Sequence, residues 1–233
     1  MKKRIYKSFI QVLPLLISAI LLSAPLSAQK VMKSDLEKKE VTPLYNGTSI
    51  GLDLFGIGSK LFGGDFLSSE VSIDVNLKNK FFPVLEVGYG TTNTTGDENG
   101  IQYKSSAPFA RIGMNYNTMS KGKSASFLYV GLRYGFSAFK YDVQAPPLSD
   151  GIWPGALTFK YTDEKSHAQW LEFVVGVKAQ IYKNFEMGWA LRYKYRLSAK
   201  ENPNSSPWYI PGFGSNSANK FGVTYNLIYK LPF

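Results

Sequence analysis

The sequence predicts an all-β protein, an eight-stranded antiparallel up-and-down transmembrane β-barrel. Eight segments alternate apolar and polar residues with a period of two, which is typical of strands with one apolar face. Turn-forming residues separate these segments. After residue 28, no continuous apolar stretch approaches the ~18 residues of a membrane-spanning helix.

The last segment, residues 221–233, shows the clearest alternation. Every odd position from Phe221 to Phe233 carries a large apolar or aromatic side chain. The even positions are small or polar, except Ile228. Because successive side chains of a strand point to opposite faces, the segment is predicted to form a strand with one apolar face.

Seven further strands are expected before this one. They lie at about residues 48–56, 69–77, 81–91, 109–116, 126–141, 168–182 and 185–198. The connections after the second, fourth and sixth strands are short, whereas residues 92–106, 142–166 and 199–219 are expected to be loops. Alternating short turns and long loops are typical of membrane barrels, and an even strand number places both ends on one side.

The polar face is expected to point inward. An eight-stranded barrel has an interior just wide enough for side chains to fill. The polar positions carry the glycines, such as Gly88, Gly135 and Gly176, whereas the apolar positions carry bulky residues such as Trp189 and Tyr225. Small and charged residues fit the crowded interior, and bulky apolar ones fit the lipid side.

Charges of both signs are predicted to form an interior charge network. Its members are Asp53, Glu70, Asp74, Glu86, Glu172 and Glu186 against Arg111, Arg133, Lys178, Arg192, Lys194, Arg196 and Lys230. Isolated charges in a confined interior are costly, so pairing across neighbouring strands is expected. Such packing favours a plugged interior; a gated ion path or a polar ligand pocket is the alternative.

The chain begins with a predicted signal peptide, residues 1–28. Basic residues precede an apolar run at 12–22, and small residues lead up to a predicted cleavage after Ala28. A flexible periplasmic leader is expected at residues 29–45, and the barrel at 46–233. The chain has no Cys, which excludes Cys-linked lipid, disulfides and Cys metal sites.

The chain as a whole resembles small eight-stranded bacterial outer-membrane barrels of the OmpA-barrel and OmpX type. More narrowly, it is similar to an uncharacterised family of such barrels in Bacteroidota. The matching segments are MGWALRYK at 187–194, YIPGFG at 209–214 and YKLPF at 229–233. The resemblance implies a place in the outer membrane among its lipids. It also implies that Tyr225, Tyr229 and Phe233 form the signal read by the barrel assembly machinery.

Charge and composition indicate which partners are expected. The formal charge of +10 falls to +6 without the four basic residues of the predicted signal peptide. An exported protein rarely meets nucleic acid, so no nucleic-acid partner is expected, and contact with anionic lipid head groups is a better explanation of the charge. No cofactor is expected, because one His and scattered carboxylates make no ligand set.

Two aromatic loop segments form a candidate partner site. Trp153, Trp208, Tyr209 and Phe213 place apolar bulk where solvent is expected, and exposed apolar clusters mark partner sites. The alternative is that these loops pack on each other and cap the barrel. The lead hypothesis is therefore a non-enzymatic structural or partner-binding protein that acts through its extracellular loops.

Two other functions remain open. The chain could be an outer-leaflet lipid-modifying enzyme, with His167 as a general base near Ser166, Asp163 and Glu164. The His-x-Ser order of lipid A deacylases is missing, because Ala168 and Gln169 follow His167. A narrow pore or small-ligand binder is the third possibility.

Overall fold

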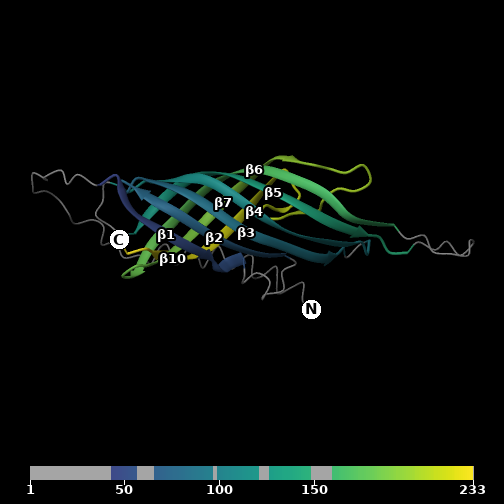
Figure 1. Cartoon of the computed structure of the whole chain (residues 1–233), viewed down its shortest axis with the longest axis horizontal. Coiled ribbons are helices and arrows are strands. Elements are labelled where there is room, and N and C mark those ends of the chain that lie inside the picture. Colours follow the sequence, from purple (N-terminus) through teal and green to yellow (C-terminus); the bar gives the residue numbers. More distant parts are fainter. Residues whose placement is uncertain (1–42, 57–65, 97–98, 121–125, 148–158, 233) are drawn as a thin grey trace, which may run out of the picture. The chain divides into compact units, whose positions relative to one another are not determined.

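The computed structural model describes residues 43–56, 66–96, 99–120, 126–147 and 159–232. They belong to one compact unit, Thr42–Phe233. Eight antiparallel strands close into a barrel in the order β1-β10-β7-β6-β5-β4-β3-β2 (Figure 1). Their bounds are β1 Tyr45–Asp53, β2 Phe66–Leu77, β3 Phe81–Thr95, β4 Gln102–Asn117, β5 Phe127–Gln144, β6 Lys160–Tyr182, β7 Phe185–Ala199 and β10 Asn219–Lys230. Two short strands, β8 (Tyr209–Ile210) and β9 (Gly214–Ser215), pair within the β7–β10 connection.

The barrel closes where the first strand meets the last. β1 pairs with β10 from Ser49↔Lys230 to Asp53↔Asn226. The prediction of an eight-stranded antiparallel up-and-down barrel is therefore confirmed. The predicted signal peptide, leader residues 29–42 and Phe233 lie outside the described residues.

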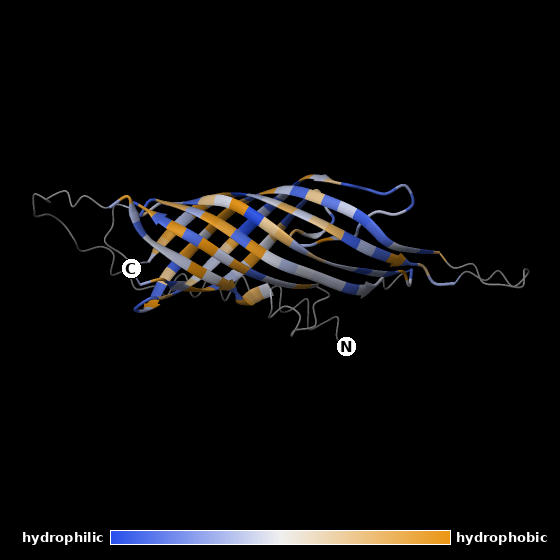
Figure 2. Ribbon diagram, in the orientation of Figure 1, coloured by the Kyte–Doolittle hydropathy of each residue, from blue (hydrophilic) through white to orange (hydrophobic). Residues whose placement is uncertain are grey.

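The two faces of the wall differ in polarity. Large apolar side chains point outward, with Leu132 65% and Trp189 55% exposed, whereas Glu86 and Arg111 are buried. Figure 2 shows hydrophobic residues concentrated along part of the barrel wall. A protein in water would bury this apolar face. Apolar residues outside and charges inside are the arrangement of a transmembrane barrel. Within the described residues, no helix is long and apolar enough to cross a membrane.

The barrel has a turn end and a loop end. The turn end carries Tyr45, Lys230 and the tight connections between β2 and β3 and between β6 and β7. The β2–β3 connection is a type I′ turn, because Lys78 and Asn79 both have φ of +55° and Lys80 N–H donates to Leu77 O at 3.0 Å. The loop end lies opposite.

Four strands continue past their expected ends into segments that the sequence predicted as loops. β3 and β4 stay paired to Thr95↔Gln102, and β5 and β6 to Gln144↔Lys160. We call residues 93–95, 102–104, 140–144 and 160–167 the extension. The expectation of loops was wrong for the residues of the extension that lie within 92–106 and 142–166. Their alternation is largely polar, so it lacks the hydrophobic contrast that identifies a membrane strand.

Candidate functional site

Six buried charged side chains from six consecutive strands meet inside the barrel. This central charge cluster consists of Glu70, Glu86, Arg111, Arg133, Glu172 and Arg192. Arg111 Nη1 lies 2.7 Å from both Glu70 Oε2 and Glu86 Oε2, and its Nε lies 3.0 Å from Glu172 Oε1. The guanidinium therefore joins carboxylates of three strands.

Arg192 makes a second set of bridges within the cluster. It lies 2.7 Å from Glu86, 3.0 Å from Glu70 and 3.2 Å from Glu172. Arg133 Nε adds a 2.7 Å contact to Glu86 Oε1. Each buried charge thus has partners of opposite sign, as the low dielectric of an interior requires.

The other members of the predicted charge network are not part of this cluster. Lys178 Nζ pairs with Asp74 Oδ2 at 2.7 Å, and Lys194 Nζ lies 3.9 Å from Glu172. Asp53 instead accepts backbone N–H groups, and Arg196 donates to Asn216. Among the described residues, four of the thirteen predicted members make no ion pair within 4.0 Å: Asp53, Glu186, Arg196 and Lys230.

The β8–β9 hairpin packs against the charge cluster from the loop-end side. We call residues 207–216 the inner hairpin. Lys194 Nζ donates to Gly212 O at 2.7 Å and Phe213 O at 3.3 Å, and Arg111 Nη2 donates to Gly212 O at 3.2 Å. Gly212 has φ of +81°, and a Cβ there would lie 2.4 Å from the Phe109 ring. Glycine is therefore required at the tip of the hairpin.

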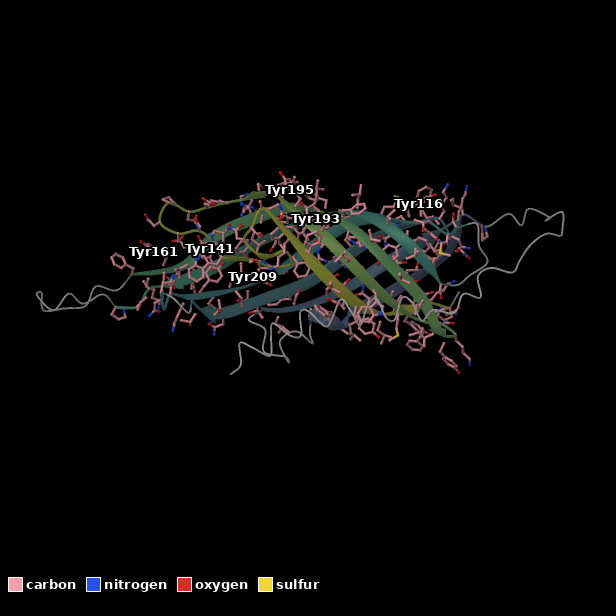
Figure 3. The ribbon with its side chains drawn as sticks, turned by 180° about the vertical axis from the view of Figure 1, so that it is seen from behind. Tyr116, Tyr141, Tyr161, Tyr193, Tyr195 and Tyr209 are labelled. Carbon is pink, nitrogen blue, oxygen red and sulfur yellow. The ribbon has the colours of Figure 1, made fainter. Side chains whose placement is uncertain are left out.

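An aromatic cluster surrounds the inner hairpin. Tyr103 stacks on Tyr141 and on Trp208, with ring centroids 5.6 and 5.5 Å apart. Its hydroxyl donates to Tyr209 O at 3.1 Å. Figure 3 shows Tyr141 and Tyr209 towards one end of the barrel and Tyr116 towards the other. The aromatic cluster therefore occupies the loop-end half of the interior.

The structure differs from the expectation for the aromatic loop segments. Tyr209 and Phe213 are 3% and 2% exposed, and Trp208 is half-buried. The expectation of exposure to partners was therefore wrong for Tyr209 and Phe213, whereas Trp208 keeps a partly exposed side chain. The interior has room for them because Gly90 lacks a side chain: a Cβ there would lie 2.9 Å from Tyr209 Oη. Trp153 lies outside the described residues.

Glycines pair with inward-pointing aromatic residues on neighbouring strands. Gly88 pairs with Phe109, Gly135 with Trp170, and Gly176 with Tyr129. A Cβ on these glycines would lie 2.4, 2.2 and 2.5 Å from the partner ring. Both glycines and aromatic residues occur at polar-face positions of the sequence. This combination was the sequence signal that large rings fill the interior.

Two of the residues expected to mark assembly lie on the outward face of β10. Tyr225 packs on Trp189 with ring centroids 4.3 Å apart, and Tyr229 packs on Phe185 at 5.0 Å. Tyr229 is 38% exposed. These pairs form part of the lipid-facing surface.

The residues considered for catalysis do not lie together on one face of β6. Ser166 is buried, and its hydroxyl donates to Lys200 O at 2.7 Å. His167 is exposed on the opposite face of β6, as adjacent residues of a strand must be. Among the described residues, no group of three or more His, Cys, Asp or Glu side chains is placed to hold a metal ion.

Comparison with known proteins adds a family and two structural likenesses. A family model described as "Domain of unknown function (DUF6048)" matches residues 5–233. No curated protein matches the chain.

The chain is similar to the crystal structure of Neisserial surface protein A (NspA), with 13% identity and a TM-score of 0.44 over 80% of this chain and 99% of that one. It is also similar to a major outer membrane protein from Thermus thermophilus, with 13% identity and a TM-score of 0.41 over 79% and 98% of the two chains. The fold assignment rests on the strand register of this chain. By the match to the family model, the protein belongs to the DUF6048 family.

Proposed function

We propose that this protein is a bacterial outer-membrane barrel with a closed interior that acts as a structural or partner-binding component through its loop end. The observation that carries the proposal is the filling of the interior. Mutually paired charges from six strands meet in the central cluster, and the inner hairpin above them is hydrogen-bonded to Arg111 and Lys194. A conducting pore needs a continuous aqueous path, which this packing opposes.

The outward face supports placement in the outer membrane. Its apolar side chains suit lipid, and within the described residues the barrel wall is built from hydrogen-bonded strands. Closed barrels of this type belong to bacterial outer membranes, and the predicted signal peptide provides for export.

Conductance in a planar lipid bilayer tests whether the interior is closed. We expect the wild-type protein to give no single-channel steps. A variant in which a Gly-Ser linker replaces residues 207–216 and Ala replaces Glu86, Arg111 and Arg192 should conduct, because it lacks both the hairpin and the centre of the charge cluster. Steady wild-type conductance would contradict the proposal. The linker variant also shows whether the assay detects an opened barrel of this size.

The extension supports contact with a partner at the loop end. Lys104, Lys140 and Thr162 are exposed there, so the outer surface of the extension is suited to water and not to lipid. A photo-crosslinking amino acid at Thr162 should capture a protein partner in intact cells. The same group at Leu132, in the apolar outer face, is the matched control and should give lipid adducts only. Identical adducts at the two positions would contradict a partner-binding loop end.

We further propose that the barrel is not an enzyme. His167 and Ser166 lie on opposite faces of β6, which disfavours a catalytic pair. Cells that carry His167→Ala should have the same lipid A species as wild-type cells by mass spectrometry, and a changed profile would revive the enzymatic alternative.

A further inference from the structure

Six aromatic side chains form a ladder of three rungs on the lipid-facing surface, where β7 pairs with β10. Each rung joins a residue of β7 to its registered partner on β10, with ring centroids 5.0, 4.3 and 5.1 Å apart. From the turn end, the rungs are Phe185↔Tyr229, Trp189↔Tyr225 and Tyr193↔Phe221. Because successive rungs are four residues apart, all six rings lie on the outer face of the wall. We call these six residues the aromatic ladder.

The middle rung of the ladder lies deep in the apolar band. Trp189 and Tyr225 are each four residues away from both outer rungs. Four residues of a tilted membrane strand rise by about 10 Å, and the apolar band of a membrane barrel is about 25 Å tall. The outer rungs therefore lie near the borders of the band, and the middle rung lies near its centre.

The middle rung carries two polar groups at this depth. Among the described residues, neither the Tyr225 hydroxyl nor the Trp189 indole N–H has a hydrogen-bond partner. Tyr and Trp are enriched at the membrane borders, where these groups meet water. Lipid chains offer no hydrogen bonds, so an unpaired polar group among them is costly. The middle rung is therefore suited to contact with protein rather than with lipid alone.

A second copy of the chain has the matching groups at the matching depth. Two copies with the same orientation in one membrane are related by a two-fold axis along the membrane normal, so equivalent residues lie at equal depth. Such an axis places β7 of one copy opposite β10 of the other. Trp189 of each copy then faces Tyr225 of the other. The indole N–H only donates and the hydroxyl oxygen accepts, so two reciprocal hydrogen bonds can form.

The ladder also has the size of a dimer interface. Apart from Tyr225, its rings are 37–66% exposed, and exposed Leu191, Val223 and Leu227 lie between the rungs. With about 150–250 Å² for each aromatic side chain, this face offers roughly 700 Å², close to the ~800 Å² that each partner buries in a stable complex. Because the gain from burying apolar surface is small in lipid, ring packing and hydrogen bonds must supply the association.

We propose that two copies of this chain associate in the membrane through the aromatic ladder, with Trp189 of each copy donating to the Tyr225 hydroxyl of the other. This dimer rests on the proposed placement of the barrel in lipid, and it leaves the loop end free for another partner.

Energy transfer between labelled copies of the whole protein, folded in phosphatidylcholine vesicles, tests the proposal. The chain has no Cys, so Lys104→Cys in the extension accepts a single donor or acceptor dye. We expect energy transfer that rises with the protein-to-lipid ratio and is lost when unlabelled protein is added in excess. Flotation of the same vesicles separates two failures. Protein that does not float would contradict the placement in lipid, whereas floating protein without energy transfer would contradict the dimer alone.

Three variants test the hydrogen bonds. Tyr225→Phe and Trp189→Phe each keep an aromatic ring but remove one side of both bonds, so each should raise the dissociation constant of the dimer about tenfold. Tyr134→Phe is the matched control, because it removes a hydroxyl from the outer face of β5 and should leave the constant unchanged. The circular dichroism spectrum of each variant should show that it folds.

Disulfide cross-linking locates the contact. In a mixture of Leu191→Cys copies and Val223→Cys copies, oxidation should join the two kinds of chain, because the two-fold axis brings these positions together. Ile112→Cys is the control. Ile112 is 62% exposed on β4, on the side of the barrel opposite β7 and β10, so these copies should stay unlinked.

Three results would overturn the proposal. Monomers at every protein-to-lipid ratio would mean that lipid alone covers the ladder. Equal dissociation constants for Tyr225→Phe, Trp189→Phe and Tyr134→Phe would mean that the middle rung does not hold the dimer. Cross-linking of Ile112→Cys copies as complete as that of the Leu191→Cys and Val223→Cys mixture would mean that the copies do not meet at the ladder.

Discussion

At the scale of single residues, Glu86 is the one carboxylate among the described residues that contacts three arginines. Its two oxygens contact Arg111, Arg133 and Arg192 at 2.7 Å each. Removal of a partner from a buried ion pair leaves an uncompensated charge, which is far more costly than loss of a solvated pair. The stability of the barrel should therefore depend strongly on this one carboxylate.

Replacement of Glu86 tests this dependence. Glu86→Ala should lower the free energy of unfolding by about 3–5 kcal/mol, measured by urea titration of the barrel in lipid vesicles. Lys140→Ala is the control, because Lys140 and Asp163 form an exposed ion pair at 3.0 Å. Its loss should cost less than about 1 kcal/mol. Equal effects of the two variants would contradict a tightly coupled cluster.

The inner glycines provide a second test at this scale. Gly135→Ala would place a Cβ 2.2 Å from the Trp170 ring and should cost about 1–3 kcal/mol through overpacking. Gly222→Ala is the matched control, since its nearest neighbour is the flexible end of Lys194 at 3.4 Å. The same urea titration applies. A Gly135→Ala barrel as stable as the Gly222→Ala barrel would mean that Trp170 moves freely.

At the scale of elements, the alternating pattern predicted all eight strands of the wall but not the full length of four of them. In the extension, buried Tyr103 alternates with exposed Gln102 and Lys104, a pattern that the turn-forming residues nearby obscure. The inner hairpin was missed for a different reason. Its apolar residues have no periodicity, and the carbonyl contacts of Lys194 depend on tertiary geometry that no local pattern encodes.

The hairpin contacts lead to a prediction for Lys194. Lys194→Met keeps the length of the side chain but loses both carbonyl contacts of the inner hairpin. Amide hydrogen exchange of residues 209–215 should therefore accelerate, by about tenfold for each ~1.4 kcal/mol lost. Lys230→Met, with no contact to the hairpin, should leave this exchange unchanged. Slow exchange in Lys194→Met would show that aromatic packing and the hydrogen bonds from Arg111 and Tyr103 hold the hairpin without Lys194.

At the scale of the whole molecule, the chain reverses the polarity of a water-soluble protein. Charged residues such as Arg192 are buried, whereas Ile112 and Leu132 are 62% and 65% exposed. The sequence predicted this direction from the glycines on the polar face. It could not predict which charges pair, because Arg192 and Glu70 are 122 residues apart and come together only when the barrel closes.

A gel-shift experiment on the isolated outer-membrane fraction tests the central claim, a folded barrel in the outer membrane, most directly. Unboiled and boiled samples are compared by electrophoresis in dodecyl sulfate. We expect the protein in this fraction, with an unboiled band that migrates differently from the boiled one, because closed membrane barrels resist the detergent until heated. A band in the soluble fraction that does not shift on boiling would contradict the account.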